Sequence, residues 1–152
     1  MRFTIKKTDR EIAAAILMRL ANHPTEHHDS FCLSWFYDYD IEYLSAVAKD
    51  LGYENIPNRP FIRRLQKVCR RLEAVGILSG RISSCHKEYM GEPTVLKSYC
   101  FADPAYAWRL APERWPHYKP MGRSEVELEL FLDRAFPECY KNRYYDVDLI
   151  MD

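Results

Sequence analysis

The chain has 152 residues, enough for one well-packed domain and too few for two ordinary ones. Hydrophobic residues make up 47% and charged residues 29%, a composition that excludes a disordered chain and predicts a soluble globular one. The 22 basic residues equal the 22 acidic ones, so there is no general attraction to nucleic acid, and any such binding has to come from a local patch.

The sequence predicts neither a membrane span nor a secretory signal. No apolar run approaches the roughly 20 residues that a membrane-spanning helix needs. The start "MRFTIKKTDREIAAAILMRL" has charges where a signal peptide needs an apolar stretch. The five cysteines are scattered without a C-x-x-C pair, which predicts reduced, mostly buried thiols. We expect an intracellular protein, in cytoplasm, nucleoid or nucleus, with no membrane partner.

The first predicted helix begins at a capping box formed by Thr8 and Glu11. Apolar residues follow at helical spacing and cover most of the cylinder, which predicts a central helix that is contacted on several sides and stops before Pro24. An aromatic-rich segment comes next, and we expect a short strand in it, near Phe31 to Phe36.

Two more helices are expected before a hairpin. The second runs from about Asp40 to Leu51, with Gly52 as its left-handed C-cap. The third covers residues 58–75, with Asn58 as its cap and Gly76 at its end. The segments "ILSGRISSC" and "TVLKSYCFAD" then predict two strands joined by a loop around "HKEYMGEP".

The third helix, "NRPFIRRLQKVCRRLEAVGIL", is strongly segregated. Its basic residues occupy one arc of the helical wheel and its apolar residues the next. From residue 58 to residue 81 there are seven basic residues against Glu73 alone. An ordinary exposed helix mixes charges of both signs, and like charges one turn apart repel each other, so a polyanionic partner would compensate for this pattern.

The last part of the chain differs in character. Four prolines interrupt residues 104–123, where we expect a surface connector that packs through Trp108 and Trp115 and contains at most a short helix, beginning at Pro104 with Asp103 as its cap. Ser124 and Glu127 form a second capping box, which favours a helix over "SEVELELFLDRAF" although its apolar residues also alternate as in a strand.

This order of elements resembles the winged helix-turn-helix superfamily. The resemblance covers about Thr8 to Asp103 and includes the "L..L...G.L" pattern of Leu65, Leu72, Gly76 and Leu78. It implies an α+β, mainly α fold, with a three-helix core plus a β-hairpin wing and a C-terminal helical extension. The expected division is a winged domain over 1–103, a Pro-rich connector over 104–123, and an acidic helix and tail over 124–152. The connection between the first two helices is longer than is usual in the superfamily.

The resemblance and the charges together predict a protein that binds double-stranded DNA, most simply a transcriptional regulator. The recognition helix would be residues 58–75, lying in or beside the major groove, with Arg59, Arg63 and Lys67 nearest the DNA. Arg64, Arg70 and Arg71 would reach phosphates, and the hairpin would extend the footprint through Arg81, Lys87 and Lys97.

Two alternatives stay open. Winged helices also serve protein contacts, so the basic helix could instead bind an acidic protein surface. Within the chain, residues 124–152 carry eight carboxylates against three basic residues. This acidic segment either folds back over the basic helix and competes with DNA, or meets a second protomer in a homodimer formed through the C-terminal helix.

Other chemistry is set aside. His27 and Cys32 are zinc-ligand types in one segment, but no second cluster accompanies them, so we expect no metal and no cofactor. Phosphate-binding, nucleophile-elbow and zinc-protease motifs are absent from the sequence, and we expect no enzyme. The aromatic residues from 35 to 43 could line a ligand pocket, but a place in the core is favoured.

Overall fold

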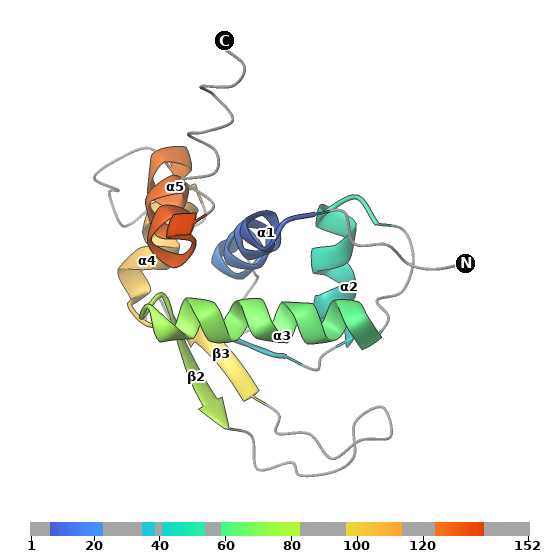
Figure 1. Cartoon of the computed structure of the whole chain (residues 1–152). Helices are drawn as coiled ribbons and strands as arrows, with labels where there is room; N and C mark the ends of the chain where they lie inside the picture. The colour runs from blue at the N-terminus through green and yellow to red at the C-terminus, as the bar shows by residue number, and fades with distance from the viewer. Residues whose placement is uncertain are drawn as a thin grey trace.

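The computed structural model describes residues 7–22, 35–38, 41–53, 59–82, 97–113 and 124–138. These residues form an α+β, mainly helical fold, as the sequence predicted, and the short strand joins the two hairpin strands in a three-stranded antiparallel sheet (Figure 1). The described elements are, in chain order, α1 (Asp9–Asn22), β1 (Trp35–Tyr37), α2 (Ile41–Asp50), α3 (Arg59–Ala74), β2 (Leu78–Ile82), β3 (Lys97–Phe101), α4 (Pro104–Leu110) and α5 (Ser124–Ala135).

Helix α1 lies at the centre and packs against all four other helices (Figure 1). Ile12, Ile16 and Leu17 are fully buried in it. At its start the Glu11 amide donates to the Thr8 hydroxyl oxygen at 3.1 Å, and that hydroxyl in turn donates to the Glu11 carboxylate at 3.2 Å. The predicted N-cap at Thr8 and the predicted central position of this helix are confirmed, whereas the Glu11 carboxylate contacts the Thr8 hydroxyl and not the Thr8 amide of a full capping box.

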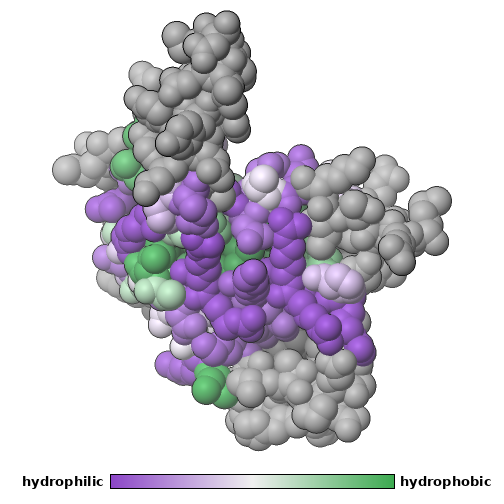
Figure 2. All heavy atoms as spheres, viewed as in Figure 1, coloured by the Kyte–Doolittle hydropathy of each residue, from purple (hydrophilic) through white to green (hydrophobic). Residues whose placement is uncertain are grey.

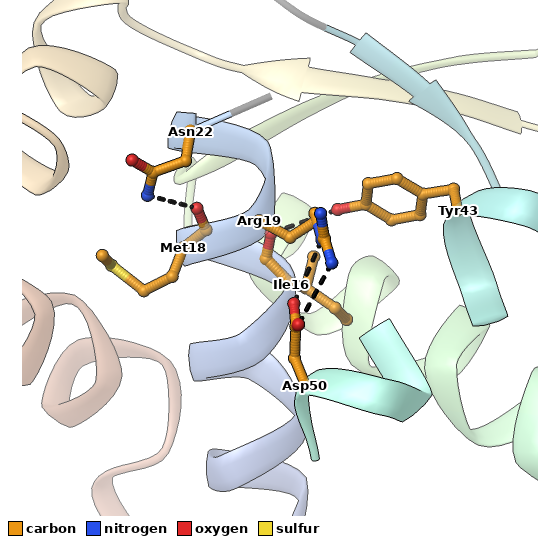
Figure 3. A network of polar contacts seen from close by, with 6 residues as sticks. All are labelled: Ile16, Met18, Arg19, Asn22, Tyr43 and Asp50. Atoms are coloured by element: carbon orange, nitrogen blue, oxygen red, sulfur yellow. Dashed lines mark hydrogen bonds and ion pairs between the residues drawn. The ribbon is translucent and has the colours of Figure 1, made fainter. Parts of the chain in front are cut away.

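Polar contacts join α1 to α2 at one end of the core (Figure 3). The buried Tyr43 hydroxyl donates to the Ile16 carbonyl oxygen at 3.1 Å. Arg19 forms a bidentate ion pair with Asp50, with its Nε at 3.0 Å and its Nη2 at 3.1 Å from the two carboxylate oxygens. Because that ion pair is partly exposed, its contribution to stability is about 1 kcal/mol or less. The buried tyrosine contact therefore matters more for the placement of α2.

The sheet has the order β1-β3-β2, with both pairings antiparallel. Its covered face consists of Phe36, Leu78, Tyr99 and Phe101, which all belong to the core. The Phe36 ring stacks on the Tyr43 ring with their centroids 4.2 Å apart. These two aromatic residues therefore belong to the core, as predicted, whereas Tyr39 lies outside the described residues. The strand expected near Phe31 to Phe36 is observed slightly later, at Trp35–Tyr37.

A glycine ends each of the helices α2 and α3, as predicted. Gly52 and Gly76 have φ values of 91° and 77°, in the left-handed region that residues with a Cβ rarely adopt. After α3, the Ile77 amide donates to the Leu72 carbonyl oxygen at 3.0 Å. This is the hydrogen bond that closes a Schellman motif across six residues. The chain therefore leaves α3 sharply and enters β2 beside it.

The core does not stop at residue 103. Asp103 caps α4 by accepting a hydrogen bond from the Ala105 amide at 2.9 Å, so the predicted short helix is present. This helix buries Ala107 and Leu110, and the Tyr106 ring meets the Phe131 ring of α5 edge to face. The described part of the expected surface connector is thus an integral part of the core. Trp108 is half-buried against that core, and Trp115 lies outside the described residues.

Gly80 in β2 leaves room for an ion pair between α3 and β3. The Lys97 Nζ atom lies 2.8 Å from the Glu73 carboxylate. A methyl group at position 80 would overlap that carboxylate and would lie 2.9 Å from Cε1 of the Tyr99 ring. Both neighbours are held in place, Glu73 by the ion pair and Tyr99 by burial.

We predict that Gly80→Ala lowers the free energy of unfolding by about 1 to 3 kcal/mol, because the new methyl group has to displace packed neighbours. Urea unfolding followed by circular dichroism measures this change. Ser79→Ala, at the exposed neighbouring position, is the control and should change stability by less than about 0.5 kcal/mol. Equal stability of the two variants would contradict the packing described here.

Candidate nucleic-acid interface

Three basic side chains form a line along the exposed side of α3. Arg63, Lys67 and Arg70 are exposed and lie four and three positions apart, so they share one face of the helix. Arg59, one turn earlier, continues the line and is half-buried. At 1.5 Å per residue the line from Arg63 to Arg70 is about 10 Å long. We call these four residues the basic stripe; the surface along α3 is hydrophilic (Figure 2).

The stripe exists because the opposite side of α3 is apolar. Six residues of the helix are buried in the core, namely Phe61, Ile62, Leu65, Val68, Cys69 and Leu72. Their burial fixes which face of the helix meets α1 and the sheet, and it leaves the basic face outside. Among the described residues, no carboxylate lies within ion-pair distance of Lys67 or Arg70. Lys67 and Arg70 therefore form no direct ion pair with a carboxylate in this part of the chain.

Arg64 has a structural role beside the stripe. Its Nε atom donates to the Asp9 carboxylate at 2.7 Å and its Nη2 atom to the Lys7 carbonyl oxygen at 2.6 Å. Both charged side chains are only 29% exposed, so this ion pair is better shielded from water than a surface pair. Arg64 ties the N-terminal half of α3 to the start of α1, and we leave it out of the interface.

Arg71 ties the other end of α3 to the end of α5. Its Nε atom donates to the Ala135 carbonyl oxygen at 2.8 Å, and its guanidinium pairs with Glu138 and lies 4.6 Å from the centroid of the Phe136 ring. A cation at a helix C-terminus also interacts favourably with the helix dipole. The pKa of Glu138 is lowered by a backbone hydrogen bond and by Arg71. The phosphate contacts expected for Arg64 and Arg71 are thus replaced by contacts within the chain.

The hairpin contributes one further exposed cation, Arg81, in β2 directly after α3. Its carbonyl oxygen accepts a hydrogen bond from the Ser98 hydroxyl, and its side chain extends from the exposed end of the strand. Lys97, which was expected to widen the footprint, is paired with Glu73 instead. Lys87 lies outside the described residues. The basic stripe and Arg81 therefore remain as the candidate interface.

The acidic C-terminal segment meets the body of the protein away from Lys67 and Arg70. On α5, Glu129 and Asp133 pair with Arg10 of α1, and Glu138, just after the helix, pairs with Arg71. Val126 and Leu130 are the exposed large apolar residues of α5, at 53% and 59%. The homodimer expected through this helix stays a prediction, as does competition with DNA by residues 124–152, of which residues 139–152 lie outside the described part.

Asp38 is a buried carboxyl group beneath α3 that the sequence analysis did not single out. It is 4% exposed and follows β1 directly. One of its carboxylate oxygens accepts a hydrogen bond from the Lys97 amide at 3.1 Å. Burial raises the pKa of Asp38 to about 6, against the opposing effects of that hydrogen bond and of the positive charges of Arg70 and Lys97. An acidic residue among aromatic ones near a strand gave no local signal of burial.

His27 and Cys32, the zinc-ligand types of the sequence, lie outside the described residues. No group of three or more histidine, cysteine or acidic residues in the described part of the chain could hold a metal ion. Cys69 is buried, and burial raises its pKa. None of the described helices is both long enough and apolar enough to cross a membrane. Compared with models of protein families, with curated proteins and with solved structures, the chain shows no match in any of the three.

The raised pKa of Asp38 predicts a pH-dependent contribution to stability. Its folded pKa of about 6 exceeds the ordinary value of 3.8, so the folded state binds more protons between these values. Stability from this group is therefore greatest below about pH 4 and is lost as the pH rises through 6. The loss corresponds to at most about 3 kcal/mol.

Asp38→Asn keeps an oxygen that can accept the Lys97 amide hydrogen bond but cannot ionise. We expect its stability relative to the native protein to improve progressively between pH 4 and pH 7. Urea unfolding of both proteins at several pH values measures the difference. A difference that stays constant across this range would show that Asp38 is not destabilised by ionisation in the folded state.

Proposed function

We propose that this protein binds double-stranded DNA through α3 and β2, as a winged helix-turn-helix protein that regulates transcription. The order α1, β1, α2, α3, β2, β3 agrees with the order that the resemblance implies. In this arrangement α3 is the recognition helix, and the hairpin of β2 and β3 is the base of the wing. The packing of α4 and α5 onto α1 adds a C-terminal layer to that core.

The observation that carries the proposal is the basic stripe itself. A DNA major groove is about 12 Å wide and admits one helix, and its edges carry phosphates that attract closely spaced cations. The stripe offers Arg63, Lys67 and Arg70 over about 10 Å of helix, all exposed and all of one sign. Such a line of like charges costs stability in the free protein, and a polyanion removes that cost.

The same geometry sets the expected strength of the electrostatic contribution. The four stripe residues and Arg81 provide five cations, so the slope of log affinity against log salt should be no steeper than about −4.5. This corresponds to a loss of two to three orders of magnitude in affinity between about 50 and 200 mM salt. An interface with an acidic protein that has an apolar centre would depend on salt much less.

We predict that Lys67→Gln with Arg70→Gln weakens binding to a random-sequence duplex and makes the salt slope shallower by about 1.8, because two phosphate contacts are lost. Fluorescence anisotropy across a salt series measures both quantities. The matched control is Lys49→Gln with Arg109→Gln, which removes the same charge from α2 and α4.

An equal effect of the two double variants would mean that only net charge matters, and it would contradict an interface on α3. Absence of binding at low salt by the folded native protein would overturn the DNA proposal. It would direct attention to an acidic protein surface as the partner of the stripe.

A further inference from the structure

A polar cluster around the buried Asp38 lies beneath the stripe, where α3 passes the end of β1 and the start of β3. Asp38 and Lys97 exchange hydrogen bonds: the Asp38 amide donates to the Lys97 carbonyl oxygen at 2.9 Å, and the Lys97 amide donates to the Asp38 carboxylate. From α3, the Gln66 side chain donates to the Asp38 carbonyl oxygen at 3.3 Å. Arg70, which belongs to the stripe, lies one helical turn beyond Gln66 on the same side of α3.

Two cations act on the Asp38 carboxylate, and only one of them is bound to another carboxylate in the described part of the chain. Lys97 forms the ion pair with Glu73, so much of its charge is compensated there. Arg70 is exposed, and its positive charge favours the ionised form of Asp38. The Lys97 amide hydrogen bond and the charge of Arg70 thus both favour the ionised carboxylate, and of these two only the Arg70 charge lies on the surface to which a DNA phosphate would bind.

We propose that Asp38 regulates the DNA-binding surface through its proton: the ionised carboxylate competes with DNA phosphate for the charge of Arg70, and binding takes up a proton at Asp38. This inference rests on the proposed function. A phosphate at Arg70 neutralises the cation and adds negative charge above a carboxylate that is shielded from water. Both changes favour the protonated carboxyl group. By reciprocity, protonation of Asp38 strengthens DNA binding.

The other groups that face Asp38 do not titrate in the same range. They are Cys69 on α3 and Tyr99 on β3, and burial raises the pKa of each well above neutrality. The Tyr99 hydroxyl is buried without a hydrogen-bond partner among the described residues, so it offers the carboxylate no compensation. Glu73 is held by Lys97. Burial brings the pKa of Asp38 to about 6, whereas it moves those of Cys69 and Tyr99 further above neutrality.

The direction in which DNA affinity changes with pH follows from the pKa of Asp38 in the free protein and in the DNA complex. The pKa of Asp38 is about 6 in the free protein, and neutralisation of Arg70 by a phosphate would raise this pKa in the DNA complex. Affinity should therefore rise as the pH falls from about 8 toward 6, and the contribution of Asp38 should be constant below that range. Because Arg70 is exposed and water screens its charge, we expect a change of about fivefold, at the low end of typical coupling between sites.

The test compares the native protein with Asp38→Asn, using anisotropy with a labelled duplex at pH 5.5, 6.5 and 7.5 and constant ionic strength. At pH 7.5 the variant should bind about fivefold more tightly than the native protein, and at pH 5.5 the two affinities should agree. Asp103→Asn is the matched control: it removes one negative charge, and asparagine caps a helix as well as aspartate does. Its affinity relative to the native protein should be independent of pH.

Isothermal titration calorimetry supplies a second readout that affinity alone does not give. In two buffers of different ionisation enthalpy at pH 7, the native protein should take up a fraction of one proton on binding DNA, and Asp38→Asn should take up less. The same pH dependence and proton uptake in both proteins would overturn the regulatory inference while leaving DNA binding intact. Absence of binding by either protein at low salt would overturn both proposals.

Discussion

The rotation of α3 about its own axis is the constraint on which the rest of the surface depends. Its six buried residues fill the space between α1 and the sheet, and any rotation would expose part of that set. A fully buried leucine or phenylalanine contributes roughly 1.5 to 3 kcal/mol, so the apolar face determines the orientation of the helix far more strongly than its surface charges do. The basic side chains point outward as a consequence of this packing.

The basic residues of α3 then divide into two kinds. Arg64 and Arg71 lie at the edges of the buried face, where carbonyl and carboxylate oxygens of α1 and α5 are within reach, and they hold the helix at both ends. Arg63, Lys67 and Arg70 lie on the outer face. A helix that is fixed in this way presents its exposed cations in one defined line, which reduces the ordering cost of binding a groove. Arg64 and Arg71 thus contribute to the geometry of the proposed interface by holding α3 in place.

Local signals in the sequence were sufficient to predict much of the secondary structure. The Thr8 cap, the glycines that end α2 and α3, the Asp103 cap and the apolar period of α1 are short-range features, and each is present as predicted. The partners of Arg64 and Arg71 could not be found in this way. Asp9 and Ala135 lie 55 and 64 positions away from these arginines, and a helical wheel contains no information about such distant groups.

The burial of polar residues also could not be predicted from sequence patterns. Asp38 is enclosed because β1 ends beneath α3. The Glu73 carboxylate does not offset the charge of the stripe because it is paired with Lys97 of β3. The proline-rich segment predicted a surface connector, yet the apolar face of α4 completes the core between α1 and α5. In each case the outcome depends on which elements meet in three dimensions. The basic residues of α3 remain the candidate site, and its proposed membership is narrower because Arg64, Arg71 and Lys97 have partners within the chain.

The most direct test of this account is to map the DNA-bound surface by NMR, following backbone amide and arginine side-chain signals during titration with a short duplex. The account predicts that the largest changes occur at Arg63, Lys67, Arg70 and Arg81, with Arg64 and Arg71 keeping the side-chain signals of the free protein. Changes concentrated on the exposed face of α5, around Val126 and Leu130, with α3 unaffected, would contradict it.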